Sequence, residues 1–199
     1  RGALHGDLRR CPGRLDLQID IADTEQRPRL DSECDLTRAI AIDGQFYPAK
    51  VNLAMLYNRQ GKNDKAERLL REVTDDHPEL YEIKYSLGLL MAEQNRFAEA
   101  VVLMGDAAAG LPQRSRIHYN LGLLLKELRR DTQAESALKR ALAVEPENPD
   151  YLYALAVFYL QRQQFEKARQ VAEKMIAKPA SRSTGERLLT VIEQQRSAS

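Results

Sequence analysis

Residues 85–104 read YSLGLLMAEQNRFAEAVVLM, and residues 119–138 read YNLGLLLKELRRDTQAESAL. The two segments start 34 residues apart and share a tyrosine, a Leu-Gly-Leu-Leu run and an alanine at matching places. The same spacing continues on both sides, and its marks are Tyr47, Tyr81, Ser115 and Pro149. A period of this length is typical of proteins built from repeated pairs of helices, in which each pair buries its apolar face against the next.

Each segment of this period has the pattern of two helices joined by a turn. Numbering from the four marks gives the segments 47–80, 81–114, 115–148 and 149–182. Positions 4, 7, 8 and 11 share one face of a first helix (helix A), and positions 20, 24 and 27 share one face of a second (helix B). Small residues at positions 8 and 20 let the two helices approach closely, and a proline at position 32 ends helix B in three segments. The repeated small residues are Ala54, Gly88, Gly122 and Ala156 at position 8, and Ala66, Ala100, Ala134 and Ala168 at position 20.

These segments resemble tetratricopeptide repeats, whose pattern has a large residue at position 4, Leu at 7, a small residue at 8, an aromatic at 11, Ala at 20 and Pro at 32. The resemblance covers residues 47 to about 180. It implies an all-α fold, a right-handed α-solenoid of four helix–turn–helix repeats. The main departure is position 4, where we expect a lighter core because the family's Trp is replaced by Lys50, Lys84, His118 and Leu152. We expect His118 to be a buried core residue with its hydrogen bonds satisfied, rather than a ligand.

The flanks follow the repeats only in part. Residues 183–199 are predicted to form a C-terminal capping helix, whose apolar stripe consists of Leu188, Leu189 and Ile192. Residues 30–46 are predicted to contain a helix, from about Leu30 to Ile42, that packs on the first repeat. Residues 1–29 do not fit the pattern, and we expect an irregular N-terminal arm or the remnant of a preceding domain. Because the chain begins with Arg1 rather than Met, we expect it to be a piece of a longer protein.

The charge balance argues against nucleic-acid binding, and the hydropathy argues against membrane insertion. The chain has 30 Lys and Arg against 29 Asp and Glu, so no strongly basic field exists to bind nucleic acid. Its longest uncharged apolar run, Tyr151–Leu160, is about half of what a bilayer-spanning helix needs, so we predict no membrane insertion. No signal peptide is recognised, and the cytoplasm and the periplasm both remain open as compartments.

The sequence also lacks the motifs of the common catalytic and cofactor sites. We find no GxSxG, GxGxxG, HExxH or CxxCH. Cys11 and Cys34 form no CxxC pair, although a disulfide between them is an alternative in an oxidising compartment. We therefore predict a protein that is not an enzyme and that holds neither a cofactor nor a metal.

The resemblance implies that the A helices line a concave surface. Three tyrosines at position 5 lie there beside apolar residues at position 9, with amides and one lysine between them. Tyrosines give a large contact area with a polar tip, and asparagines can bind the backbone of an extended peptide. The alternative is that these residues are merely frequent in the family and pack between neighbouring helices. The predicted peptide-binding groove consists of Asn52, Met55, Tyr85, Leu89, Tyr119, Asn120, Leu123, Lys126, Tyr153 and Val157.

Two functions are consistent with these patterns. The first is a protein–protein interaction scaffold that binds a partner peptide or helix in this groove, with self-association through the solenoid ends as a further expectation. The second is an accessory domain of a larger exported redox protein, because residues 46–73 and 148–168 resemble the C-terminal repeat segments of bacterial multihaem cytochrome family proteins. The family's clamp for a C-terminal carboxylate is not expected, since Val51 and Met55 stand where it needs lysine and asparagine.

Overall fold

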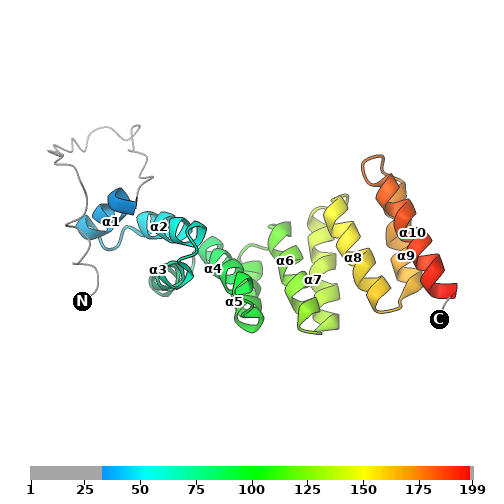
Figure 1. Ribbon diagram of the computed structural model, residues 1–199, viewed down its shortest axis with the longest axis horizontal. Helices are drawn as coiled ribbons and strands as arrows, with labels where there is room; N and C mark the ends of the chain where they lie inside the picture. The colour runs from blue at the N-terminus through cyan, green and yellow to red at the C-terminus, as the bar shows by residue number, and fades with distance from the viewer. Residues whose placement is uncertain (1–32, 198–199) are drawn as a thin grey trace. The chain divides into compact units, whose positions relative to one another are not determined.

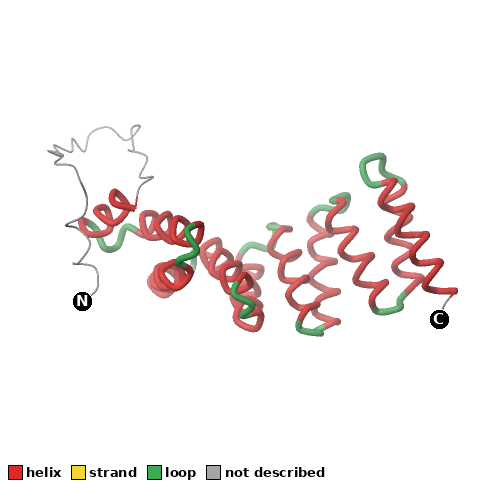
Figure 2. The backbone as a smooth tube through the Cα atoms, in the orientation of Figure 1, coloured by secondary structure: helices red, strands yellow, loops and turns green. Residues whose placement is uncertain are grey.

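The computed structural model describes residues 33–197, and this part of the chain contains helices and no strand (Figure 2). It divides into two compact units, the first ending at Pro78 and the second beginning at Glu79. The first unit contains α1 (Glu33–Ile42), α2 (Tyr47–Arg59) and α3 (Asn63–Asp76). The second contains α4 (Tyr81–Glu93), α5 (Phe97–Gly110), α6 (Ser115–Glu127), α7 (Asp131–Val144), α8 (Pro149–Gln161), α9 (Phe165–Ile176) and α10 (Arg182–Ser197). The all-α fold predicted from the sequence is confirmed.

Within the second unit each helix packs on the next along the chain (Figure 1). Helices α2, α4, α6 and α8 begin at position 1 of the four segments and are their A helices, whereas α3, α5, α7 and α9 are their B helices. The two helices of a repeat are in close contact at position 8. A Cβ added to Gly88 would lie 2.9 Å from Met104 Cγ, and one added to Gly122 would lie 2.8 Å from Leu138 Cγ. The backbone of helix A therefore lies against side chains of helix B at this position, which explains why every segment has a small residue there.

The turn between the two helices has one conformation in all four segments. Position 15 has a positive φ each time, although only the first segment has glycine there. The residue after it donates its N–H to the carbonyl at position 11, as Lys62 does to Tyr57 at 2.9 Å. This arrangement ends helix A in a left-handed cap that strains any residue other than glycine. The residues at position 15 are Gly61 (φ 72°), Asn95 (φ 61°), Arg129 (φ 57°) and Gln163 (φ 56°).

Position 4 differs from the prediction of a lighter core. Lys50 is only 3% exposed, and its Nζ lies 2.6 Å from Glu72 Oε1 on α3. Lys84 reaches Asp106 on α5 at 3.9 Å. In both repeats the lysine stem fills the space of the missing aromatic ring while its ammonium group meets an acid at position 26 of helix B. The core is filled by a long side chain rather than lightened.

His118 occupies the same position in the third segment and has no charge partner among residues 33–197. Its side chain is 4% exposed, and its Nε2 lies 3.0 Å from the carbonyl oxygen of Pro112. The prediction of a satisfied core histidine is confirmed.

Two helices flank the segments. Leu36 of α1 is 2% exposed and packs with Ala49 and Leu53 of α2. At the other end, Gly185 of α10 lies so close to α9 that an added Cβ would be 2.8 Å from the carbonyl oxygen of Ala172. Cys34 is disulfide-bonded, while Cys11 and the arm expected at residues 1–29 lie outside the described residues.

Candidate functional site

The predicted groove residues of the second unit lie on one surface, which we name the A-helix face. It is formed by positions 5 and 9 of α4, α6 and α8. Most of these side chains are half-buried, and Tyr153 is 46% exposed. They are therefore neither core residues nor freely solvated ones, and their remaining exposed surface is available for contact. The face consists of Tyr85, Leu89, Tyr119, Leu123, Tyr153 and Val157.

A hydrogen bond fixes the first tyrosine of this face. Asn120 on α6 donates its Nδ2 to the hydroxyl of Tyr85 on α4 at 2.6 Å. Burial raises the pKa of Tyr85, and the hydrogen bond from Asn120 opposes that effect. The amide of Asn120 thus holds a neighbouring repeat and keeps one N–H and its carbonyl oxygen for a ligand.

The second tyrosine is held by a stacked ring that the sequence analysis missed. Tyr119 stacks on Tyr151 of α8 with ring centroids 4.8 Å apart and planes at 30°. Tyr151 is 2% exposed, and its hydroxyl lies 3.2 Å from Ser115 Oγ, which also bonds Glu145. Tyrosine at position 3 occurs only in the fourth segment, so no repeated pattern marked it.

Two cations, Arg116 and Lys126, lie on α6, the helix that carries Tyr119. Lys126 is half-buried, and its Nζ is 3.3 Å from Glu127 Oε1. Arg116 is exposed, and its positive charge lowers the pKa of Tyr85 and of Tyr119 against the larger raising effect of burial. Arg116 thus brings a positive charge to the two tyrosines, which suits a partner with mixed apolar and polar side chains.

The first unit holds the remaining predicted groove residues. Asn52 and Met55 both lie on α2 and are exposed, Met55 at 57%. A methionine is an adaptable contact residue because its thioether is flexible and polarizable. Neither side chain makes a hydrogen bond or ion pair within residues 33–197.

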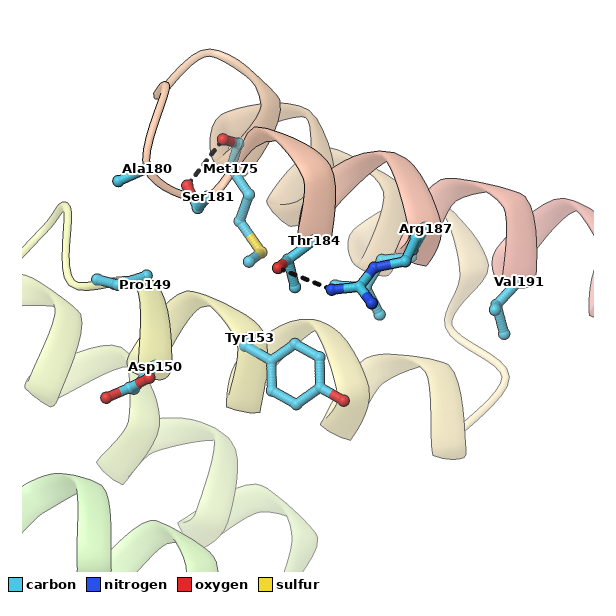
Figure 3. A pocket seen from close by; sticks show the side chains of 10 residues that line it. Pro149, Asp150, Tyr153, Met175, Ala180, Ser181, Thr184, Arg187 and Val191 are labelled. Atoms are coloured by element: carbon cyan, nitrogen blue, oxygen red, sulfur yellow. Dashed lines mark hydrogen bonds between the residues drawn. The ribbon is translucent and has the colours of Figure 1, made fainter.

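An open pocket of about 450 Å³ lies between α8, α10 and the loop that joins α9 to α10 (Figure 3). Tyr153 is the one predicted groove residue in its lining. Sequence reasoning missed the contributions from α10, namely Thr184, Arg187 and Val191. Their signal was available, because α10 continues the repeat numbering, but this segment has Thr190 at position 8 and Glu193 at position 11, where the other segments have alanine or glycine and a large apolar or aromatic residue.

Between residues 33 and 197, histidine, cysteine and acidic side chains do not gather in groups suited to a metal ion. None of the helices in that range combines the length and the hydropathy of a membrane span.

Comparison with known proteins agrees with this architecture. Three models of the tetratricopeptide repeat match residues 51–116, 115–148 and 132–190. No curated protein is significantly similar to the sequence.

Several solved structures share the fold at low sequence identity. MamA superposes with a TM-score of 0.71 at 19% identity, covering 77% of this chain and 84% of its own. YrrB, described as a tetratricopeptide repeat protein with an unusual peptide-binding site, gives 0.70 at 14% identity, covering 83% and 86%. PilF of Pseudomonas aeruginosa gives 0.66 at 23% identity, covering 82% and 77%. With the family models, the repeated hairpins and these structures in agreement, the chain belongs to the tetratricopeptide repeat family.

Proposed function

We propose that this chain is a protein-interaction scaffold whose A-helix face binds an extended peptide or a helix of a partner protein, without catalysis. The observation that carries the proposal is the row of tyrosines at position 5 on successive A helices, Tyr85, Tyr119 and Tyr153. Two of them are fixed before any partner arrives, by Asn120 and by Tyr151. Preorganised aromatic side chains lose little entropy on binding, so more of the contact energy contributes to affinity.

The position 9 column adds apolar contact area. Leu89, Leu123 and Val157 are half-buried, so each contacts its neighbours and still exposes part of its side chain. If these residues served only to pack helix against helix, they would resemble Leu90 and Leu124, which are 2% and 8% exposed. The difference supports a binding surface over the alternative of simple interhelical packing.

Further support comes from a structural relative and from the first unit. YrrB, which has the same fold, is described as having an unusual peptide-binding site. Asn52 and Met55 on α2 are exposed in the first unit, where they stay predicted peptide contacts. The alternative role, an accessory domain of an exported multihaem cytochrome-like protein, stays a prediction from the sequence.

Peptides selected on the chain itself test the proposal. A phage-displayed library of random dodecapeptides is panned on the full chain, and the affinity of enriched peptides is measured by fluorescence anisotropy. The double variant Tyr119→Ala/Leu123→Ala is expected to bind them about tenfold more weakly or worse, because both truncated side chains lie centrally on the A-helix face.

A matched control removes apolar surface elsewhere. Val102 of α5 is 64% exposed and lies on a B helix, so Val102→Ala should leave the affinity unchanged. Circular dichroism establishes that both variants keep the fold. Equal affinity of the double variant and the unaltered chain would refute the proposed surface.

A further inference from the structure

Helix α10 stands where the A helix of a fifth repeat would be. Counting on from residue 183 places Arg187 at position 5 and Val191 at position 9, in line with Tyr153 and Val157 of α8. Helix α10 packs on α9 and also touches α8, just as α8 touches the preceding A helix α6. The last helix therefore extends the A-helix face instead of only covering the end of the core.

The open pocket between α8 and α10 belongs to that extension. Tyr153 and Val191, which are 46% and 38% exposed, flank it, and the buried side chains of Met175 and Leu188 also line it. A volume of about 450 Å³ accepts a large apolar side chain together with part of its backbone. Figure 3 shows the Tyr153 ring lying between Asp150 and Arg187.

Arg187 brings an unneutralised charge to this pocket. Its Nη2 donates to Thr184 Oγ1 at 3.4 Å, and it forms no ion pair with any described residue. Two other arginines of α9 and α10 do form such pairs, since Arg169 lies 2.9 Å from Glu173 and Arg196 lies 2.9 Å from Glu166. Arg182 instead donates to the carbonyl oxygen of Ile176. A guanidinium beside apolar walls, with a hydroxyl next to it, is suited to a carboxylate because it can donate two parallel hydrogen bonds.

The pocket contains one acid, Asp150, which is not paired with Arg187. Its negative charge acts on Tyr119, whose pKa is raised mainly by burial and further by Asp150. Arg187 is the one basic residue among those that line the pocket, so a bound segment meets a positive charge of this lining only there.

We propose that this pocket takes an apolar side chain of the partner peptide against Tyr153 and Val191, while Arg187 binds an aspartate or glutamate side chain of the same peptide. The inference rests on the proposed function, which it narrows to acidic–apolar peptide segments. The Thr184 hydroxyl accepts from Arg187 and can donate its own O–H to the carboxylate. An acidic group at this end gains a charge-assisted bond, and a basic group there is repelled.

A change of sequence preference tests this assignment. Random dodecapeptides displayed through their C-termini offer side-chain carboxylates only, and they are panned on the full chain and on the variants Arg187→Glu and Arg140→Glu. On the unaltered chain we expect enrichment of an acidic residue next to a large apolar one. The peptides enriched on Arg187→Glu should carry Lys or Arg in place of the acidic residue. Arg140→Glu makes the same change of net charge at an exposed arginine of α7 and should keep the original motif.

Affinities then separate this inference from the proposed function. Arg187→Gln should weaken the acidic peptides about tenfold, and replacing the peptide's acid by its amide should give the same loss without adding to it. An unchanged motif and affinity in the Arg187 variants, with binding still lost in Tyr119→Ala/Leu123→Ala, would overturn the pocket assignment and leave the A-helix face intact. If the Arg187 variants lose affinity and the double variant does not, the pocket assignment stands and the wider A-helix face is refuted as the binding surface. A library that enriches no peptide overturns both.

Discussion

The Tyr159 hydroxyl donates a hydrogen bond of 2.8 Å to Glu135, and so ties the A helix α8 to the preceding B helix α7. Lys139 and Lys167 approach the same carboxylate at 2.6 Å and 3.5 Å. The arrangement recurs three repeats earlier, where the Tyr57 hydroxyl donates to Glu33 at 3.0 Å. Tyrosine at position 11 thus bonds successive hairpins to one another, in addition to filling the core.

Removing this hydroxyl should weaken the fold. Tyr159 is 3% exposed, and Tyr159→Phe keeps the ring but breaks the bond to Glu135. We expect a loss of about 1 kcal/mol in the free energy of unfolding, measured by urea denaturation. The control is Tyr153→Phe, since the Tyr153 hydroxyl has no hydrogen bond among residues 33–197 and its loss should not change the midpoint. Equal effects of the two variants would contradict the role of the bond.

The same carboxylate predicts an acid dependence of stability. The pKa of Glu135 is lowered by hydrogen bonding from Lys139, by the hydroxyl of Tyr159 and by nearby lysine charges, against a smaller raising effect of burial. A lowered pKa in the folded state means that the stabilisation is complete above the ordinary Glu pKa and is lost as pH falls through the lowered value. Glu135→Gln should therefore reduce stability at neutral pH and flatten its decline below about pH 4.5. A decline as steep as that of the unaltered chain would exclude Glu135 as a contributor.

Substitutions at two glycines distinguish the effect of backbone strain from that of steric contact. An added Cβ would meet no atom within 4 Å at either Gly61 or Gly105. Gly61 has φ of 72°, so Gly61→Ala should destabilise by about 1 kcal/mol, whereas Gly105 lies inside α5 and Gly105→Ala should stabilise by about 0.5–1 kcal/mol. Chemical denaturation measures both. Effects of the same sign would contradict the left-handed turn assigned to position 15.

The buried Lys50 of the first repeat predicts how stability changes when the acid that pairs with it is removed. Glu72→Ala removes the nearer acid from Lys50 and leaves Asp76 at 3.9 Å, so the first unit should lose about 1–3 kcal/mol. Lys50→Met keeps the length of the side chain without its charge and should cost less, or stabilise. Urea denaturation compares the two variants. A Lys50→Met variant less stable than Glu72→Ala would show that the ion pair contributes more than the packing of the stem.

The sequence predicted the fold because its period repeats in every segment and each mark has a physical cause. The small residue at position 8 and the alanine at position 20 report close helix contact wherever they occur, as at Gly122. Features that occur once were not predictable in this way. The stacking of Tyr151 on Tyr119 and the hydrogen bond from Asn120 to Tyr85 depend on which side chains meet between neighbouring repeats. The pattern of residues along the chain does not show which side chains are in contact between repeats.

The most direct test of the account is a map of amide chemical shifts recorded while a selected peptide is added to the isotopically labelled chain. Binding to the A-helix face predicts that the largest changes cluster at Tyr85, Tyr119 and Tyr153 and at their neighbours on α4, α6 and α8. Changes centred on the B helices α5, α7 and α9, with these tyrosines unaffected, would contradict it.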